Sequence, residues 1–515
     1  MPTTDLYQLL KKHWGYSEFR PKQEAIVHSI LAGRDTAVVM PTGGGKSLCY
    51  QLPAVASGKT CVVVSPLIAL MQDQAVGLRE MGIEAEFLNS SLDSAAIERA
   101  KRRAERGELA LLYLSPERIV RPDVVAWLSR LPLGFFAIDE AHCISEWGHE
   151  FRPEYRQLRT LRDRFPDVPI AAFTASATKQ VRHDILNQLR LDDPAKFAMS
   201  FHRPNLRYLV RQTKPDELQR MILAALDYYD EGNVILYAPT IKMVEETAAW
   251  LSSKGHGTVG YHGQMSPKQR EKNQDTWMSG EKRVLVGTLA FGLGINKPDV
   301  RAVLHLSLPK SVEQYYQEAG RAGRDGEPAD CVLFWQKKDA GLLQCFIQQV
   351  EDAEERQRGW TRYHVLRRFV EEAQCRHRQI CLHFGETPKW ERCEACDVCG
   401  VTLDWMTSAA LASIVKDTPR TRVSVVRREK SAVTPQADLA PVDAACEAAL
   451  RKWRKEMAEE RGVPAFVILH DTTIAELSRL CPKTNAALLG ITGIGEKKAE
   501  RFGKQILTVI ASARG

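Results

Sequence analysis

The chain lacks any apolar run near the roughly 18 residues that a membrane-spanning helix needs. Its first residues, Met1 to Tyr16, also lack the apolar core of a signal peptide. Cysteine is sparse, with 12 in 515 residues, and unevenly spread. These absences argue against a membrane protein and against a secreted disulfide framework. They predict a reducing interior and a local metal site.

Neither positive nor negative charge dominates the composition. The chain has 71 Lys and Arg against 64 Asp and Glu, a net charge of +7, which permits a polyanionic partner without requiring one. A hydrophobic content of 44% is enough for real cores. At roughly 100–200 residues per domain, the length predicts three or four domains.

Short β-type runs alternate with helical stretches to about residue 335. The expected strands are Thr36–Met40, Cys61–Val64, Ala110–Leu114, Phe135–Ile138 and Ile170–Phe173, then Asn233–Tyr237, Thr258–His262, Arg283–Val286, Ala302–His305 and Cys331–Phe334. Several are continuously apolar, which is typical of buried parallel strands. The predicted fold class is therefore α/β, with two parallel-sheet lobes followed by helical segments. The expected divisions are a first lobe at 1–205, a second lobe at 206–340, a cysteine-containing module at 341–405, a linker at 406–438 and a helical domain at 439–515.

A glycine-rich loop follows the first expected strand. It reads Pro41-Thr42-Gly43-Gly44-Gly45-Lys46-Ser47, and a helix is expected from Leu48. Glycines let backbone N–H groups approach phosphates, and a helix N-terminus adds a positive dipole. We expect Lys46 to reach the β- and γ-phosphates and the Ser47 hydroxyl to ligate Mg²⁺. Met40 stands where the strict pattern has glycine.

Two adjacent carboxylates, Asp139 and Glu140, follow the apolar run Phe135–Ile138. Together with a phosphate loop they suit a magnesium–nucleotide site. We expect Asp139 to hold Mg²⁺ through its bound water and Glu140 to orient and activate the attacking water. Phosphoryl transfer needs mostly positioning and charge neutralisation, which these carboxylates, Lys46 and the metal supply.

The acidic pair runs without a break into an aromatic segment. Trp147, Phe151, Arg152 and Tyr155 are the residues that suit stacking on unpaired bases. An aromatic loop can equally be part of a core. The continuity of the two segments predicts that nucleotide hydrolysis is coupled to nucleic-acid binding.

Three cysteines, Cys393, Cys396 and Cys399, form a C-x₂-C-x₂-C pattern. Tetrahedral Zn²⁺ requires a fourth ligand. The candidates are Cys375, Cys381, His377 and His383. On a helix Cys375 and Cys381 point about 120° apart, so one metal is not expected to bind both. An iron–sulfur cluster is the rival interpretation.

The first 400 residues resemble a RecQ-family DNA helicase of superfamily 2. The motifs that carry this resemblance are Phe19–Gln23, the phosphate loop, Ser65–Leu67, Tyr113–Arg118, Asp139–Tyr155, Thr174–Thr178, Ala290–Ile295 with Lys297–Asp299, and Gln317–Gly326. The resemblance implies two tandem RecA-like lobes that use ATP and Mg²⁺, track 3′-to-5′ on single-stranded DNA and separate duplexes.

The resemblance also implies roles for particular residues. Arg321 and Arg324 would lie across the cleft from the phosphate loop, where either could be an arginine finger, with Gln317 in the same nucleotide site. Tyr16, Arg20 and Gln23 resemble the family's adenine-reading group; the Gln23 amide can donate and accept at once. Cys375 matches the family's first zinc cysteine, which implies structural Zn²⁺.

The chain departs from the family pattern in three places. Asn296 stands in place of aspartate, and Ser176 interrupts Thr-Ala-Thr-Ala; an altered rate or step coupling is expected. The interval between Cys399 and about residue 440 is too short for the family's winged helix, so that domain is predicted to be absent. Within it, Lys416–Lys430 has six basic and two acidic residues, which suits a solvated tether or, alternatively, a contact to DNA phosphates.

The last 75 or so residues resemble the helical domain that RecQ helicases share with ribonuclease D. Gly493 and Gly495 precede a helix that carries Lys497, Lys498 and Arg501. These residues suit weak binding of a DNA backbone. A tight turn in a helical bundle with solvated lysines is the equal alternative.

The sequence therefore predicts an ATP- and Mg²⁺-dependent DNA helicase for repair or recombination that also contains Zn²⁺. An RNA helicase and an ATP-gated DNA clamp with little unwinding remain the rivals. The expected partners are single-stranded and duplex DNA, with single-strand DNA-binding protein and other repair proteins. A monomer in the bacterial cytoplasm, associated with the nucleoid, is expected.

Overall fold

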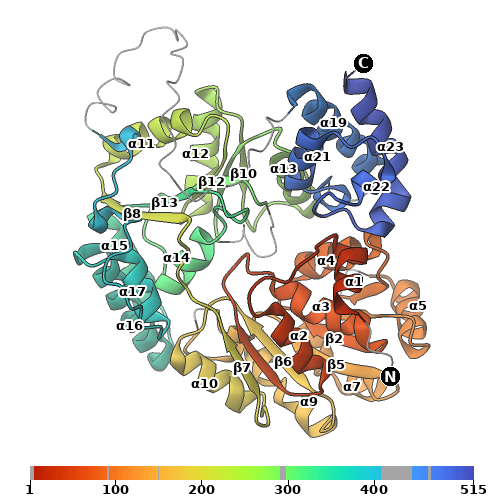
Figure 1. The fold of residues 1–515 in the computed structure, drawn as a ribbon. Helices are drawn as coiled ribbons and strands as arrows, with labels where there is room; N and C mark the ends of the chain where they lie inside the picture. Colours follow the sequence, from red (N-terminus) through yellow and green to blue (C-terminus); the bar gives the residue numbers. More distant parts are fainter. Residues whose placement is uncertain are drawn as a thin grey trace.

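The computed structural model describes residues 5–89, 92–148, 150–289, 291, 297–407, 443–461 and 465–514. Two parallel β-sheets flanked by helices form its centre (Figure 1). Most of the expected linker, with Lys416–Lys430 and the interval in which no winged helix is expected, lies outside the described residues. So does Asn296.

Lobe 1 contains a seven-stranded sheet in the order β3-β4-β2-β5-β6-β1-β7. Its strands are β1 (Thr36–Val39), β2 (Thr60–Val64), β3 (Ala85–Leu88), β4 (Leu111–Leu114), β5 (Leu133–Ile138), β6 (Ile170–Thr174) and β7 (Ala195–Ala198). Its helices are α1 (Leu6–Trp14), α2 (Gln23–Leu31), α3 (Lys46–Ser57), α4 (Ile68–Glu80), α5 (Ser94–Glu105), α6 (Pro116–Ile119), α7 (Pro122–Leu128), η1 (Ala141–Ile144), α8 (Pro153–Arg156), α9 (Arg159–Arg164) and α10 (Lys179–Gln188). All of its strand pairs are parallel.

Lobe 2 contains a six-stranded parallel sheet in the order β10-β11-β9-β12-β13-β8. Its strands are β8 (Leu206–Gln212), β9 (Asn233–Tyr237), β10 (Thr258–Tyr261), β11 (Val284–Gly287), β12 (Val300–His305) and β13 (Ala329–Trp335). Its helices are α11 (Pro215–Tyr228), α12 (Ile241–Ser253), α13 (Pro267–Met278) and α14 (Val312–Ala319). The α/β prediction is thus confirmed, and all ten expected strands are present.

Two smaller parts complete the described chain. The cysteine module comprises α15 (Lys337–Gln348), α16 (Ala353–Glu371), α17 (Arg376–His383), η2 (Asp397–Cys399) and η3 (Asp404–Met406). The C-terminal domain comprises α19 (Ala444–Arg461), α20 (Ala465–Ile468), α21 (Asp471–Leu480), α22 (Asn485–Leu488) and α23 (Glu496–Arg514). None of the helices in the described ranges has the length and apolarity of a membrane span.

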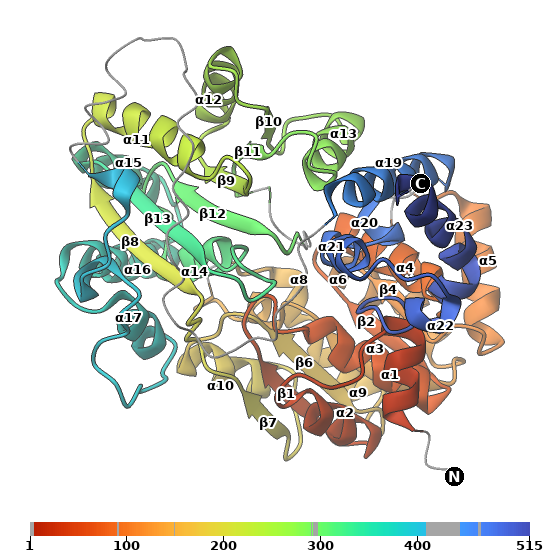
Figure 2. The ribbon, with the colours of Figure 1, turned by 45° about the horizontal axis from the view of Figure 1, so that its top comes forward.

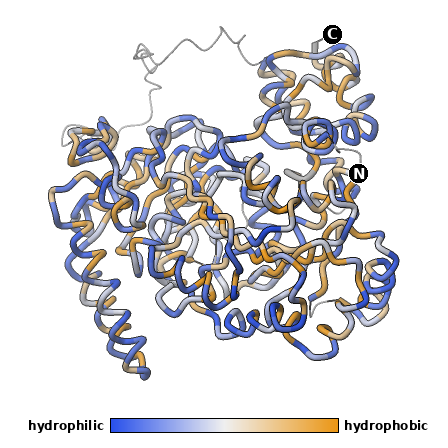
Figure 3. The backbone as a smooth tube through the Cα atoms, turned by 60° about the horizontal axis from the view of Figure 1, so that its bottom comes forward, coloured by the Kyte–Doolittle hydropathy of each residue, from blue (hydrophilic) through white to orange (hydrophobic). Residues whose placement is uncertain are grey.

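Burial explains why these segments form sheets. Every residue of β2, β6, β9 and β13 is buried, since helices cover both faces of a parallel sheet. One apolar cluster continues from lobe 1 through lobe 2 into α16 and α17. The C-terminal domain has its own core, and Figure 3 shows apolar segments alternating with polar ones in the bundle that ends at the C-terminus.

The C-terminal domain packs against both lobes. In Figure 2 its blue helices lie beside α1 and α4 of lobe 1 and beside α13 of lobe 2. The backbones come close where α1 ends. A Cβ atom added to Gly15 would lie 2.6 Å from the Ile494 nitrogen, and one added to Gly495 would lie 2.3 Å from the Lys12 carbonyl oxygen. Only glycine permits this approach.

We predict that Gly15→Ala loosens this contact whereas Gly33→Ala does not. Both glycines have left-handed φ angles, 72° and 75°, so each substitution carries a backbone penalty of about 1 kcal/mol. A Cβ at Gly33 meets nothing within 4 Å, so only Gly15→Ala adds a clash with Ile494. Hydrogen exchange of residues 490–500 should accelerate in Gly15→Ala alone. Equal exchange in the two variants would contradict the prediction.

Candidate nucleotide, zinc and nucleic-acid sites

The phosphate loop connects β1 to α3, and its shape depends on glycine. Gly43 and Gly45 have φ angles of 81° and 85°, in the left-handed region that disfavours side chains. A Cβ at Gly44 would lie 2.5 Å from Cγ of Met40. Met40 therefore fills the space beneath the loop from the position where the strict pattern has glycine. The helix α3 begins at Lys46, at the end of the loop, so its N-terminal N–H groups face the same space.

Ser47 is positioned by a polar group that sequence reasoning missed. The Gln74 amide donates to Ser47 Oγ at 3.3 Å. Its carbonyl oxygen accepts hydrogen bonds from the hydroxyls of Tyr50 at 2.8 Å and Tyr113 at 3.0 Å. A lone glutamine in a helix carries no sequence signal for this role.

The acidic pair lies at the end of β5. Asp139 is buried, and its burial, together with the charge of Glu140, raises the pKa of its carboxyl, while Lys46 opposes the rise. Glu140 has a left-handed φ of 46°. Its carboxylate lies 3.3 Å from Nδ1 of His142, which in turn lies 3.0 Å from the Thr174 hydroxyl. Carboxylates beside a lysine and the Ser47 hydroxyl form a donor set that fits Mg²⁺.

Lobe 2 contacts the phosphate loop through residues Gly320–Arg324, here called the arginine segment. Gly43 faces the Arg324 stem, because a Cβ there would lie 3.2 Å from Arg324 Cγ. Burial and the nearby charges of Arg321 and Arg203 lower the pKa of Arg324 to about 9. Such crowding of cations fits a site that receives a polyanion. The Gln317 amide donates to the Ser176 hydroxyl at 2.8 Å, so the residue that departs from the family pattern joins the two lobes.

Arg203 is the second positioning residue that the sequence did not reveal. Its guanidinium donates to the carbonyl oxygen of Thr42 at 3.2 Å, on the phosphate loop. It also donates to Gly320 at 3.4 Å, Ala322 at 3.1 Å and Gly323 at 2.9 Å on the arginine segment. In the sequence, Arg203 lies only near the expected boundary between the lobes at residue 205.

The expected adenine-reading residues contact the phosphate loop. Arg20 donates to the Gly43 carbonyl at 2.5 Å, and the Gln23 amide donates to the carbonyls of Gly44 and Gly45, each at 3.3 Å. The Gln23 oxygen accepts from the Arg20 backbone N–H at 2.9 Å. Tyr16 lies exposed at the end of α1. Both polar ends of Gln23 therefore have protein partners here.

The aromatic segment contacts the acidic pair through Tyr155, its last residue. The buried Tyr155 hydroxyl donates to the Asp139 carbonyl at 3.0 Å. Arg152 donates to the Pro66 carbonyl at 3.0 Å, and Phe151 lies 5.7 Å from the guanidinium of Arg156. Trp147 is 50% exposed, which leaves its ring available for stacking. Tyr155 is thus core, whereas Trp147 is not.

Trp147 also borders a pocket of about 400 Å³ between lobe 1, lobe 2 and the cysteine module. Arg358 of α16 lies 5.8 Å from the Trp147 ring and 3.5 Å from the Glu146 carboxylate. Lys179 and Arg362 also line the pocket. The cysteine module therefore contacts the aromatic segment directly.

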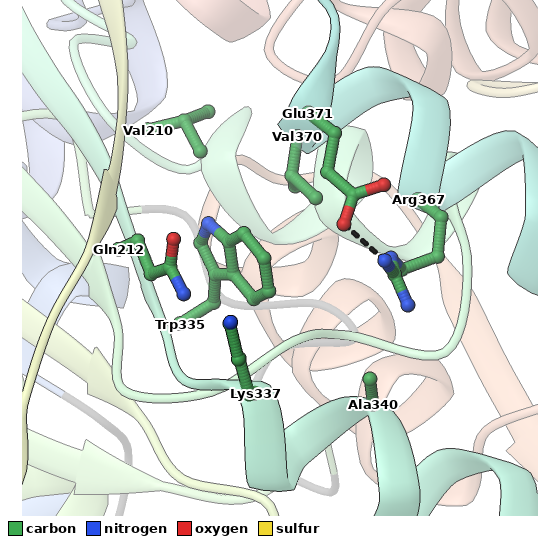
Figure 4. A pocket seen from close by; sticks show the side chains of 8 residues that line it. All are labelled: Val210, Gln212, Trp335, Lys337, Ala340, Arg367, Val370 and Glu371. Atoms are coloured by element: carbon green, nitrogen blue, oxygen red, sulfur yellow. Dashed lines mark hydrogen bonds and ion pairs between the residues drawn. The ribbon is translucent and has the colours of Figure 1, made fainter.

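A pocket of about 440 Å³ lies at the joint between lobe 2 and the cysteine module. Figure 4 shows Trp335 at its centre, between Gln212 and the Arg367–Glu371 ion pair. None of the expected nucleotide, zinc or DNA residues lines it. It is a feature of this joint rather than of the nucleotide site.

Four cysteines converge in the cysteine module. Cys375, Cys393, Cys396 and Cys399 place their Sγ atoms within 4.8 Å of one another, and those of Cys393 and Cys399 are 3.9 Å apart. Zn–S bonds of about 2.3 Å in a tetrahedron require sulfurs about 3.8 Å apart, so the group fits Zn²⁺. Cys381 is buried elsewhere on α17 and does not join them.

The two histidines near the cluster have other contacts. His377 lies 3.1 Å from Cys393 Sγ and 3.2 Å from the Arg203 carbonyl oxygen, and burial lowers its pKa to about 4. His383 pairs with Glu313 at 2.7 Å. His377 therefore links the cysteine cluster to the connection between β7 and β8, which contains Arg203.

The lysines expected to bind DNA in the C-terminal domain face lobe 1. The Lys497 stem lies against Gly82, and Lys498 is only 5% exposed. Arg501 pairs with Glu80 at 2.7 Å. The structure therefore brings these residues together with lobe 1, and it does not bring them together with Trp147, Phe151 and Arg152.

Family models match four consecutive parts of the chain. The descriptions are DEAD/DEAH box helicase at residues 20–184, Helicase conserved C-terminal domain at 213–326, RecQ zinc-binding at 337–400 and HRDC domain at 443–510. The zinc-binding match includes all four clustered cysteines.

Curated relatives match over nearly the whole chain. The "ATP-dependent DNA helicase RecQ" of Pasteurella multocida is 34% identical over 96% of this chain and 92% of its own length. That of Bacillus subtilis is 32% identical over 98% of each. Among solved structures, the helicase MrfA bound to DNA and AMPPNP gives a TM-score of 0.54 at 18% identity, covering 65% of this chain and 51% of that one, which supports the fold alone. The chain belongs to the RecQ family of ATP-dependent DNA helicases.

Proposed function

We propose that this ATP-dependent DNA helicase moves 3′-to-5′ on single-stranded DNA, with closure of the two lobes coupling hydrolysis to each step. The single observation that supports the proposal most is the continuous path from the acidic pair to the aromatic segment. Tyr155 holds the Asp139 carbonyl at 3.0 Å, and Trp147 of the same segment is exposed. A base that stacks on Trp147 would therefore shift the backbone that orients the acidic pair.

In this proposal Lys46 neutralises phosphate charge, and Ser47 and Asp139 would hold Mg²⁺. When bound, Mg²⁺ neutralises charge on the β- and γ-phosphates. Glu140 accepts the proton of the attacking water. Its contact with His142 holds the carboxylate in place, which favours one orientation of that water.

Arg321 and Arg324 supply positive charge to the transition state from lobe 2. The lowered pKa of Arg324 supports this role, since crowded cations gain most from a polyanionic ligand. Closure is needed to aim both guanidinium groups, so hydrolysis reports the relative position of the lobes. Gln317, through Ser176, would transmit that position to the end of β6.

The domain boundaries also remain a proposal: lobes at 1–205 and 206–340, a zinc module at 341–405, a linker at 406–438 and a helical domain at 439–515. The two separate sheets and the separate C-terminal core support it. We further propose a monomer that works in repair or recombination at the bacterial nucleoid, with single-strand DNA-binding protein among its partners. Family membership is the support for these assignments.

Strand displacement tests the proposed function. Purified protein with ATP and Mg²⁺ should separate a duplex that carries a 3′ single-stranded tail and leave one with a 5′ tail intact. An equal rate on RNA would favour an RNA helicase, and DNA-stimulated hydrolysis without displacement would favour a clamp. Either result would overturn the proposal.

Trp147→Ala should keep its basal ATPase rate and lose most of the stimulation by single-stranded DNA. Base–aromatic stacking is worth about 1–3 kcal/mol, so the DNA concentration for half-maximal stimulation should rise by about tenfold or more. Trp147→Phe keeps a stacking face and is the matched control. Unchanged stimulation in Trp147→Ala would remove Trp147 from the coupling path.

Cys396→Ser should lose bound zinc and unfold at a lower temperature, because structural Zn²⁺ contributes directly to folding. The matched control is Cys381→Ser, which removes a buried thiol outside the four-sulfur group. Metal analysis should find one zinc per chain in the parent and in the control. A coloured protein that contains iron would contradict the assignment.

A further inference from the structure

One outer edge of the lobe 2 sheet is only partly paired. Strand β8 forms this edge, and the cysteine module meets it at one place. There the Tyr208 N–H donates to the Ala395 carbonyl at 3.1 Å, and Tyr208 forms an isolated parallel bridge with Cys396. The short helix η2 begins at the next residue and ends the pairing. Within the described ranges, the rest of this edge has no neighbouring strand.

The open part of the edge consists of Val210 and Gln212. On the inner side of β8, the Thr213 N–H donates to the Trp335 carbonyl of β13 at 2.9 Å. Backbone groups alternate in direction along a strand, so the N–H and C=O groups of Val210 and Gln212 point outward, as those of Tyr208 do. Among the described residues, none is a backbone partner of these four groups. An unpaired edge of this kind is a template for a further strand.

The same two residues border the pocket of about 440 Å³ at the joint between lobe 2 and the cysteine module. Gln212 and Trp335 are the last residues of β8 and β13, so the pocket lies at the carboxyl ends of two parallel strands. The side chains of Val210, Trp335 and Val370 supply its apolar surface (Figure 4). Paired residues on neighbouring strands place their side chains on the same face of a sheet. A strand added beside Val210 and Gln212 would therefore place side chains over this pocket.

The polar rim of the pocket contains one cation that has no acidic partner in the part of the chain that the structure describes. Arg367 and Glu371, both on α16, form an ion pair, so their charges cancel. Lys337 is the first residue of α15, lines the pocket and is exposed. The pocket therefore combines an apolar centre with a net positive rim.

We propose that the open edge of β8 and the adjoining pocket bind an extended peptide segment of a partner protein. The segment pairs with the backbone groups of Val210 and Gln212. It inserts one aliphatic or aromatic side chain against Trp335 and presents a carboxylate, two residues away, to Lys337. Main-chain hydrogen bonds supply affinity in this binding mode, and pockets for alternate side chains supply specificity. None of the residues assigned to nucleotide, zinc or DNA lines this pocket, so the inference does not depend on the proposed function.

A small molecule that fills only the pocket is the competing occupant, since a volume of about 440 Å³ is typical of small-ligand sites. Such a ligand would make no use of the open strand edge. The four outward-pointing backbone groups beside the pocket are the observation that favours a peptide.

The first test selects binders to the full chain from a random library of seven-residue peptides displayed on phage between fixed flanks. The same library is offered to Gln212→Pro and to its matched control Gln212→Ala. Proline removes only the outward N–H and leaves the ladder to β13, which an edge strand tolerates. We expect the parent and Gln212→Ala to enrich sequences with an apolar and an acidic residue two positions apart, and Gln212→Pro to enrich none of them. Equal enrichment on all three proteins, or none on the parent, would overturn the proposal.

The second test reverses the charge at the rim. An enriched peptide, synthesised with blocked ends and a fluorescent label, should bind Lys337→Glu about tenfold more weakly than the parent. The same peptide with lysine in place of its acidic residue should prefer Lys337→Glu. Lys338→Glu is the matched control, because it changes the neighbouring exposed lysine, which does not line the pocket. If the charge-reversed pair does not regain affinity, the assigned contact is wrong.

The third test asks whether the bound peptide is a strand. Methylation of one backbone amide at a time should lower the affinity at least about tenfold at every second position, because alternate amides of a strand face β8. Uniform tolerance of methylation would identify a ligand that fills the pocket alone and would overturn the proposal. DNA-stimulated ATPase activity in Lys337→Glu should equal that of the parent, so a failure of the motor and a failure of this site are measured separately.

Discussion

The nucleotide site depends on the contact between the two lobes, and the Arg203 guanidinium makes hydrogen bonds to both sides of this contact. It joins a carbonyl of the phosphate loop to three carbonyls of the arginine segment. In this arrangement Arg324 lies against Gly43, so the cations of lobe 2 lie beside the place where phosphates would bind.

The sequence predicted the fold well where burial is uniform and less well where it is not. Nine of the ten expected strands lie inside a sheet, and the tenth, β10, lies at a sheet edge. The three strands that escaped prediction, β3, β7 and β8, are all at sheet edges. Edge strands are half-solvated and carry polar residues such as Glu86, Lys196 and Arg207, which break the apolar pattern.

The sequence also predicts only part of the candidate sites, for a different reason. Residues in a continuous motif, such as the phosphate loop and the cysteine cluster, could be predicted because their chemistry needs close spacing. Arg203 and Gln74 act through contacts to residues far away in the sequence, and nothing local marks them. Lys497 and Lys498 lie on the helix that was expected, yet the sequence could not indicate that another part of the chain covers them.

The cysteine module also contacts the residues that join the two lobes and the aromatic segment. Through His377 it touches the Arg203 backbone, and through Arg358 it touches Trp147. Finally, ion pairs join the C-terminal domain to both lobes. Glu80 of lobe 1 pairs with Arg501 of the domain, and Lys297 of lobe 2 pairs with Asp471 of the domain. Any change in the angle between the two lobes must therefore break or rearrange at least one of these ion pairs.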